Sequence, residues 1–189
     1  MTAFKKTSFN HQKYSPNNAI VLPSRQWPNS IIEQAPHWCS VDLRDGNQAL
    51  IEPMSPAQKH RLYEQLIKVG FKEIEVGFPA ASDTDFQFVR NIIEHNKIPD
   101  DVTIQVLTQA RDSLIERSFE SLKGAKKAIM HVYNSTSTIQ REQVFQLDQQ
   151  GIIDIAIHGA QKVMTEAQKY PQTQWQFQYS AESFTQTEM

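Results

Sequence analysis

Residues 72–78 read Lys-Glu-Ile-Glu-Val-Gly-Phe, a short strand-like run in which apolar and charged side chains alternate. Successive side chains of a strand point to opposite faces, so one face of this run should be apolar and the other polar. The apolar face is expected to carry Ile74, Val76 and Phe78. The polar face is expected to carry Glu73, Glu75 and Gly77. Strands of a parallel sheet that is covered on both sides are usually apolar on both faces, so the run indicates a sheet with a polar side.

Three further strand-like runs repeat this pattern, at residues 38–43, 127–133 and 174–179, and a run at 102–107 completes a set of five. Their polar faces are expected to carry Asp42, Arg44, His131, Gln176, Gln178, Ser180 and Glu182. An open sheet with helices on both faces would bury these charges without partners, which is costly. A barrel accommodates them, because its inner face converges on a wet site at the carboxyl ends of the strands. A sheet with one face in solvent is the alternative.

Helix-like segments separate the five runs. Ser55 and Pro56 have the residue types of an N-cap and a first helical position, and Gly70 ends that helix. Ser82 or Asp83 caps the second helix. Apolar residues at helical spacing mark the buried faces of the four helices: Leu62, Leu66 and Val69; Phe86, Val89 and Ile93; Ile115, Phe119 and Leu122; and Ile152, Ala156, Ala160, Val163 and Ala167. Strict alternation of strand and helix predicts a parallel sheet with right-handed crossovers. The expected fold class is α/β, a partial TIM (β/α) barrel of about five of the eight βα units.

Composition excludes several classes of protein. The chain has 189 residues, of which 39% are hydrophobic and 21% are charged, and its formal net charge is -2. No basic excess would draw it onto nucleic acid, and no apolar run is long enough to cross a membrane. The single cysteine, Cys39, excludes an internal disulfide and a multi-cysteine zinc site. The N-terminus lacks the apolar region of a secretory signal, so we expect a cytoplasmic protein that binds neither nucleic acid nor membrane.

Two regions are expected along the chain. Residues 1–36 are polar, contain four prolines and are interrupted by short apolar pieces, which is typical of an extended arm that packs on another surface. Residues 37–189 carry the alternating strands and helices and are expected to form the truncated barrel domain.

The strongest local signal lies at residues 41–48, which read Val-Asp-Leu-Arg-Asp-Gly-Asn-Gln. Arg44 and Asp45 are adjacent at the end of a predicted strand, and Gly46 permits a turn. A carboxylate in that place can hold a hard divalent cation. A guanidinium beside it can donate two hydrogen bonds to an oxyanion. Arg-Asp-Gly between a strand and a helix is also an ordinary turn sequence, so both interpretations stay open at this point.

Residues 43–50, Leu-Arg-Asp-Gly-Asn-Gln-Ala-Leu, resemble the first-strand signature of the DRE-TIM metallolyase superfamily. The Asn-Gln-Ala-Leu continuation is similar to that of its alpha-isopropylmalate synthases. Four further matching stretches follow in the family's order, at residues 73–79, 105–109, 131–137 and 179–185. The resemblance covers the chain from about residue 15 to Met189 and marks it as the N-terminal portion of the catalytic barrel.

This resemblance implies an activity and its reactants. The family condenses acetyl-CoA with 2-oxoisovalerate in a Claisen reaction that gives 2-isopropylmalate and CoA, a step of leucine biosynthesis. A divalent metal would bind the keto acid, with magnesium expected first and zinc or manganese as alternatives. The complete protein is expected to be a homodimer.

Residue roles are carried over position by position. Asp45 would be the metal ligand from the first strand. Arg44 would donate to the keto oxygen as it becomes an alkoxide. His131 and Ser180 would line the keto-acid pocket. Glu182 would lie against the branched side chain and near the incoming acetyl group, so that Arg44 and Glu182 are the expected catalytic residues.

The pattern of polar side chains adds Gln48 and Glu75 to the substrate-binding set. Glu75 faces the same interior as Arg44, and it either orients that guanidinium or forms a purely structural ion pair with it. Both interpretations stay open.

One element of the family pattern is missing. The resemblance implies a His-x-His pair that completes the metal site, and the sequence contains none. We therefore expect the chain to be inactive alone. Two alternatives remain: another condensing relative, such as a citramalate or homocitrate synthase, or a non-catalytic half-barrel that associates through exposed strand edges.

Overall fold

The computed structural model describes residues 10, 13–14, 20, 22–27, 30 and 32–188. The chain divides into two units, residues 1–36 and 37–189. The expected N-terminal arm, residues 1–36, falls largely outside the described residues. All five strands of the sheet lie in the second unit.

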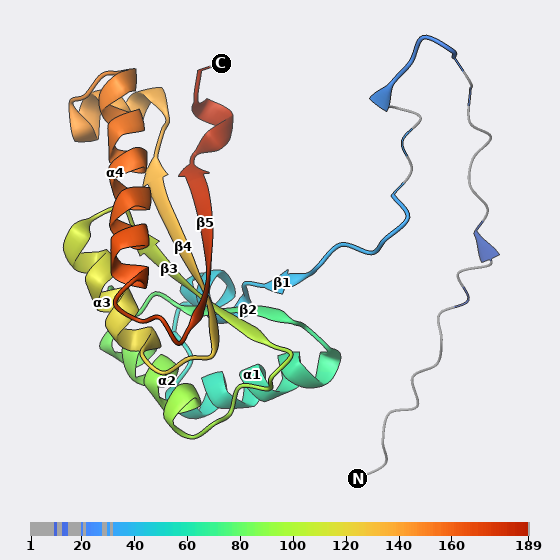
Figure 1. The fold of residues 1–189 in the computed structure, drawn as a ribbon, viewed down its shortest axis with the longest axis vertical. Coiled ribbons are helices and arrows are strands. Elements are labelled where there is room, and N and C mark those ends of the chain that lie inside the picture. The colour runs from blue at the N-terminus through green and yellow to red at the C-terminus, as the bar shows by residue number, and fades with distance from the viewer. Residues whose placement is uncertain are drawn as a thin grey trace. The chain divides into compact units, whose positions relative to one another are not determined.

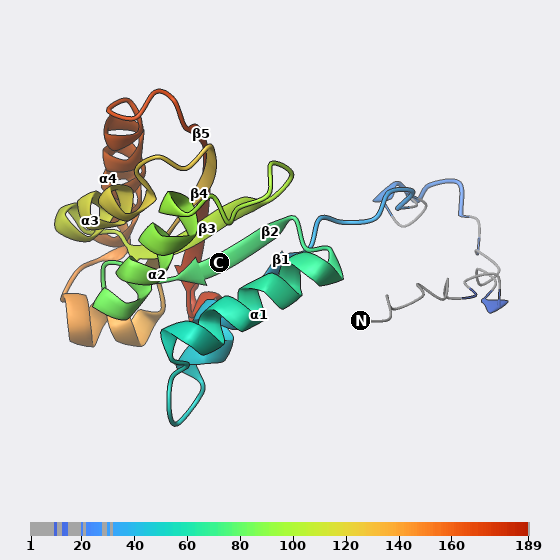
Figure 2. The same ribbon diagram turned by 90° about the horizontal axis from the view of Figure 1, so that it is seen from below.

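Five parallel strands form one sheet in which every strand pairs with the next one along the chain. They are β1 (Cys39–Ser40), β2 (Glu73–Gly77), β3 (Thr103–Gln109), β4 (Lys127–Ser135) and β5 (Gln174–Glu182). The helices between them are α1 (Pro56–Val69), α2 (Asp83–Glu94), α3 (Asp112–Leu122) and α4 (Gln149–Ala167). The sheet curls and the helices follow its outer side (Figures 1 and 2). The predicted α/β partial barrel is confirmed.

An apolar layer between the sheet and the helices forms the core. Alternate residues of the strands enter it, and all of them are fully buried: Ile74, Val76, Ile104, Val106, Ala128, Met130 and Val132. The helices contribute the buried side chains Tyr63, Leu66, Phe88, Val89, Ile92, Ile115, Phe119 and Leu122. The other side of the sheet carries the polar residues, so the two-faced character predicted from the strand patterns is present.

The helix boundaries follow local sequence signals. Ser55 accepts a hydrogen bond from the Gln58 N–H, and the Gln58 side chain bonds back to the Ser55 N–H, which completes a capping box ahead of α1. Gly70 ends α1 in the left-handed conformation, with φ of 111°. Ser82, rather than Asp83, is the N-cap of α2. Among the described residues, no helix has both the length and the apolar character needed to cross a membrane.

The first strand is shorter than the sequence predicts. The alternation at residues 38–43 indicated a strand to Leu43, but pairing stops at Ser40 and a π-helical turn spans Asp42–Gly46. Ser40 Oγ donates to Asp42 Oδ2 at 2.6 Å, and the Val41 carbonyl accepts from the N–H of Asp45 at 2.8 Å. These local bonds compete with the sheet ladder and turn the chain early.

The prediction that Phe78 shares the apolar face of β2 is wrong. The register between β2 and β3 shifts between Glu75 and Gly77, because one extra residue is inserted as a β-bulge. The bulge reverses the alternation, so Phe78 turns to the polar side of the sheet, where it lines a pocket. The buried face of α2 also differs, since Phe88 and Ile92 are buried where Phe86 and Ile93 were expected.

Candidate active site

A pocket of about 320 Å³ opens on the inner side of the sheet, at the carboxyl ends of the strands. Its walls include six of the seven predicted site residues: Arg44, Asp45, Gln48, His131, Ser180 and Glu182. The seventh, Glu75, is fully buried and contacts two of them. Residues from β4, β5 and the turn after β1, far apart in the sequence, therefore meet at one place.

The π-helical turn presents Arg44 and Asp45 differently. The Arg44 guanidinium is largely buried and donates from Nε to Glu75 Oε1 at 2.5 Å. The Asp45 carboxylate stays open to solvent, with 58% of its side chain exposed, and forms an ion pair with the Nη1 group of Arg44. The turn thus fixes a cation against the floor of the pocket and leaves a carboxylate at its rim.

Glu75 is the centre of a buried polar network. Its Oε1 accepts from Arg44, and its Oε2 accepts from Gln105 Nε2 at 2.5 Å and from His131 Nδ1 at 2.7 Å. Burial raises the pKa of Glu75, but the hydrogen bonds from His131 and Gln105 and the charge of Arg44 outweigh burial and hold the pKa below its usual value. The carboxylate is therefore ionised and receives three donors.

Hydrogen bonding fixes the tautomer of His131. Because Nδ1 lies against an ionised carboxylate, Nδ1 carries a proton and donates it to Glu75. Nε2 lies 2.7 Å from Ser180 Oγ, which faces the same pocket. Gln105 Nε2 is 3.1 Å from His131 Nδ1, so both N–H groups point at the same Glu75 oxygen. In the neutral form of the ring, Nε2 then keeps its lone pair for the hydroxyl of Ser180.

Gln105 is a polar residue of this site that sequence reasoning did not single out for a role. It is 1% exposed, and its Oε1 has no hydrogen-bond partner among the residues the structure describes. Turning the amide over would set Oε1 against the Glu75 carboxylate, so the network holds Gln105 in one orientation. Its position on the polar face of β3 was the available signal.

Glu182 is fixed at the end of β5. Its carboxylate accepts a hydrogen bond from the Ser135 hydroxyl. Its backbone carbonyl accepts from the Thr136 N–H at 3.1 Å, which ties the ends of β4 and β5 together. The carboxylate thereby takes a defined place on the rim of the pocket.

Three further residues give the pocket an apolar side: Phe78, Leu107 and Tyr133. The rings of Phe78 and Tyr133 meet edge to face with centroids 6.3 Å apart. Leu107 and Tyr133 follow Gln105 and His131 by two residues on their strands, so period-two counting could have placed them on the inner face. Phe78 could not be found in this way, because of the bulge. One half of the pocket is charged and the other half is suited to an alkyl group.

The donor groups of the chain limit the metal ions that it could hold. No group of three or more His, Cys, Asp or Glu side chains converges on a common point within the described part of the chain. Asp45 and Glu182 each place a carboxylate at the pocket; that of Asp45 pairs with Arg44, and that of Glu182 accepts from Ser135. One carboxylate completed by water and substrate oxygens fits magnesium, which usually keeps several waters, and does not fit a structural zinc ion.

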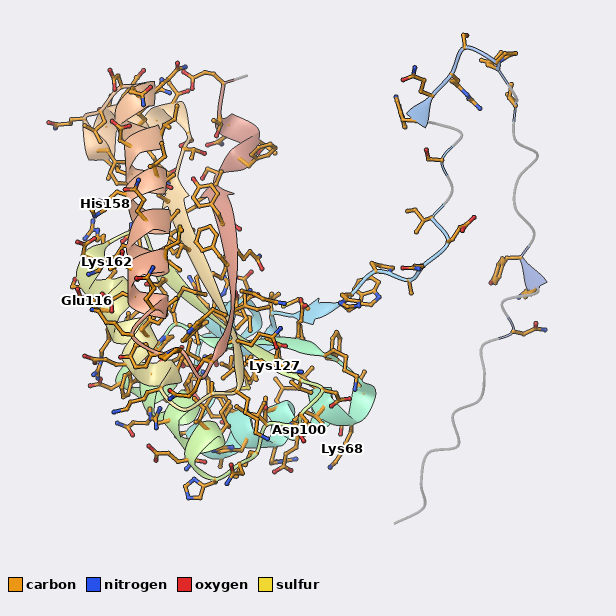
Figure 3. All side chains as sticks on the ribbon, in the orientation of Figure 1. Lys68, Asp100, Glu116, Lys127, His158 and Lys162 are labelled. Atoms are coloured by element: carbon orange, nitrogen blue, oxygen red, sulfur yellow. The ribbon has the colours of Figure 1, made fainter. Side chains whose placement is uncertain are left out.

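Several other charged contacts lie away from the pocket. His158 contacts Asp112 at 2.7 Å, and Lys162 pairs with Glu116, so both contacts join α3 to α4 on the helix layer (Figure 3). Lys127, the first residue of β4, donates from Nζ to the carbonyl of Asp100, which precedes β3, at 2.9 Å. These contacts tie neighbouring elements together and have no access to the pocket.

The chain is similar to one protein family and to several named enzymes. The HMGL-like family matches residues 35–189. The 2-isopropylmalate synthase of Alcanivorax borkumensis is 59% identical over 181 residues, which are 96% of this chain and 32% of that protein. Its counterpart from Parafrankia sp. is 60% identical over 179 residues, 94% of this chain and 32% of that protein. The enzyme of the same name from Corynebacterium efficiens is 60% identical over 170 residues, which are 90% of this chain and 29% of that protein. The chain spans about a third of the length of the curated relatives that it matches.

Proposed function

The chain belongs to the HMGL-like family, and from this premise we propose that its pocket is part of the active site of a 2-isopropylmalate synthase. That enzyme would join acetyl-CoA to 2-oxoisovalerate and release 2-isopropylmalate and CoA. The observation that carries the proposal is the convergence of Arg44, Asp45, His131, Ser180 and Glu182 on one pocket. These residues come from three separate motifs of the sequence.

Arg44 would stabilise the charge that develops during the reaction. When the new carbon–carbon bond forms, the keto oxygen becomes an alkoxide, and a guanidinium beside it lowers the barrier because the charge exists only from the transition state onward. Glu75 holds the guanidinium in place through Nε. The cation therefore needs no reorganisation at the moment of reaction.

The remaining pocket residues would bind and orient the keto acid. His131 and Ser180 offer polar groups, while Phe78, Leu107 and Tyr133 offer an apolar wall for a branched alkyl chain. Gln48 lies on the same rim as Asp45 and would contact the substrate. Glu182 would lie near the incoming acetyl group, held by Ser135.

Asp45 would hold a divalent metal, with magnesium favoured because it binds through one or two carboxylates and keeps several waters. When bound, such an ion acts as a Lewis acid that polarises the keto group and fixes its orientation. Further ligands would have to come from substrate, water and a His-x-His pair of the kind the family resemblance implies. We also propose that the complete protein is a cytoplasmic homodimer that acts on small molecules.

The decisive experiment uses a form of the protein long enough to supply the rest of the barrel. CoA release with 2-oxoisovalerate and acetyl-CoA is followed for the wild type, for Arg44→Ala and for Arg61→Ala, an exposed arginine of α1. We expect Arg44→Ala to lose about 100-fold or more of the turnover and Arg61→Ala to keep it. Near-normal turnover of Arg44→Ala would contradict the role assigned to Arg44 in stabilising the alkoxide.

Two further measurements define the substrate. Pyruvate and 2-oxoglutarate, offered in place of 2-oxoisovalerate, separate a citramalate or homocitrate synthase from the proposed enzyme. Calorimetric titration of the 189-residue chain with magnesium and 2-oxoisovalerate measures whether this part of the site binds by itself. Preference for pyruvate or 2-oxoglutarate would replace the proposed substrate.

A further inference from the structure

The carboxyl end of β2 has an unusual backbone. The ladder with β3 ends at Gly77, which pairs with Val106 after the bulge, so the N–H of Phe78 takes no part in it. A buried N–H without an acceptor is destabilising. Yet this residue is the one that turns into the pocket and meets the Tyr133 ring. Some other group must therefore hold the backbone at Phe78.

That group is the carboxylate of Asp85, in the first turn of α2. Asp85 Oδ2 accepts from the Phe78 N–H at 2.8 Å. The carboxylate lies so close to the strand that a Cβ on Gly77 would be 2.7 Å from Oδ2. Only glycine allows this approach without displacing the carboxylate. Asp85 occupies the helix position from which an acidic side chain commonly bonds back to the N-cap, but it reaches the strand instead.

Asp85 is itself fixed by a buried cation. Lys59 of α1 forms an ion pair with Asp85 Oδ1, and the two side chains are 1% and 13% exposed. The Lys59 Nζ also lies 5.2 Å from the centre of the Phe88 ring. A buried ion pair is seldom more stabilising than well-packed apolar side chains of the same volume. Stability alone therefore does not explain a fully buried lysine in this place.

We propose that Lys59 and Asp85 are positioning residues for the pocket: the pair clamps the bulged end of β2 and thereby holds the Phe78 ring in the pocket wall against Tyr133. Two helices outside the sheet thus set the shape of a wall inside it. That the wall contacts a keto acid rests on the proposed function, whereas the placement of the ring does not.

The test uses the 189-residue chain in solution. Nuclear Overhauser contacts between the rings of Phe78 and Tyr133, and the exchange rate of the Phe78 amide, are measured in the wild type and in variants. The variants are Lys59→Met, Asp85→Asn and Asp85→Ala. The matched control is Asp101→Asn, which removes the exposed ion pair between Asp101 and Lys72, just ahead of the other end of β2.

We expect Asp85→Ala to lose the ring contact and to exchange the Phe78 amide roughly tenfold faster, the effect of one lost hydrogen bond. Lys59→Met should weaken the ring contact although Lys59 touches neither ring. Asp85→Asn keeps an acceptor for the Phe78 N–H. Its ring contact and its Phe78 exchange rate should therefore lie between those of Asp85→Ala and those of the wild type. Amides of Ala128 and Met130 on β4, away from the bulge, report on general stability and should not follow the same order. Asp101→Asn should resemble the wild type.

A ring contact that persists in folded Asp85→Ala or Lys59→Met would overturn the proposal. If Asp85→Ala does not fold, Asp85→Asn and Lys59→Met decide in its place. CoA release with 2-oxoisovalerate and acetyl-CoA by the longer form of the protein separates the two claims. Its absence in the wild type counts against the proposed function, while the ring contact still tests the clamp.

Discussion

Arg44 Nε donates a hydrogen bond to Glu75 Oε1 at 2.5 Å. The bond joins the turn after β1 to the polar inner side of β2. The Glu75 side chain is fully buried, and that of Arg44 is 15% exposed. The sequence left open whether Glu75 orients Arg44 or forms a structural ion pair. The geometry is compatible with both, because the bond that orients the guanidinium also neutralises the buried carboxylate.

Glu75→Gln is expected to destabilise the chain at pH 7. The substitution keeps the size of the side chain but leaves Arg44 without its buried counter-charge and His131 Nδ1 without an ionised acceptor. Loss of one partner of a buried pair costs about 3 kcal/mol at the low end of the usual range. Urea unfolding followed by circular dichroism measures the change. Asp101→Asn, at an exposed pair, is the control and should unfold at the same urea concentration as the wild type.

The same pair predicts a dependence of stability on pH. The pKa of Glu75 is lower in the folded chain than its ordinary value of 4.5. Such a group adds stability that is fully present above the unfolded pKa and is lost as the pH falls through the folded pKa. The difference in unfolding free energy between the wild type and Glu75→Gln should therefore shrink as the pH falls below about 4.5. A difference that stays the same in acid would contradict the ionised carboxylate.

The tautomer of His131 gives a spectroscopic prediction. In ¹⁵N spectra of the neutral imidazole, Nδ1 should show the shift of a protonated nitrogen and Nε2 that of a bare one, because Nδ1 donates to Glu75. Ser180→Ala should move the Nε2 signal and leave Nδ1 protonated, since it removes only the hydroxyl next to Nε2. Glu75→Gln should shift the population towards the other tautomer. A proton found on Nε2 of the neutral ring in the wild type would contradict the hydrogen bond from Nδ1 to Glu75.

Much of the fold followed from period-two and helical patterns. The strands were recognised because one face of each is apolar, and the polar faces of β2, β4 and β5 converge as expected on the inner side. Helix caps such as Ser55 and Gly70 act through their own backbone, so they could be identified from the sequence. These signals are local, and they survive in the tertiary structure.

The missed features depend on hydrogen bonds that strand and helix patterns do not report. The end of β1 is decided by hydrogen bonds of Ser40 and Val41 that compete with the ladder, and strand propensity does not report that competition. The inward turn of Phe78 follows from the bulge, and the Phe78 N–H after the bulge donates to a carboxylate from α2. No pattern within residues 72–78 contains that information.

Gly70→Ala tests the end of α1 in isolation from packing. Gly70 has φ of 111°, and a Cβ there would meet no atom within 4 Å, so the cost of alanine is purely conformational. A left-handed alanine is less stable than glycine by about 1 kcal/mol, and urea unfolding should show a loss of that size.

Gly46→Ala is the matched control. Gly46 lies in the π-helical turn with no left-handed φ, and a Cβ added there would lie 3.7 Å from its nearest neighbour. Alanine is favoured over glycine in helical backbone, so this variant should be at least as stable as the wild type. Equal losses at both positions would mean that the end of α1 is not held by a left-handed glycine.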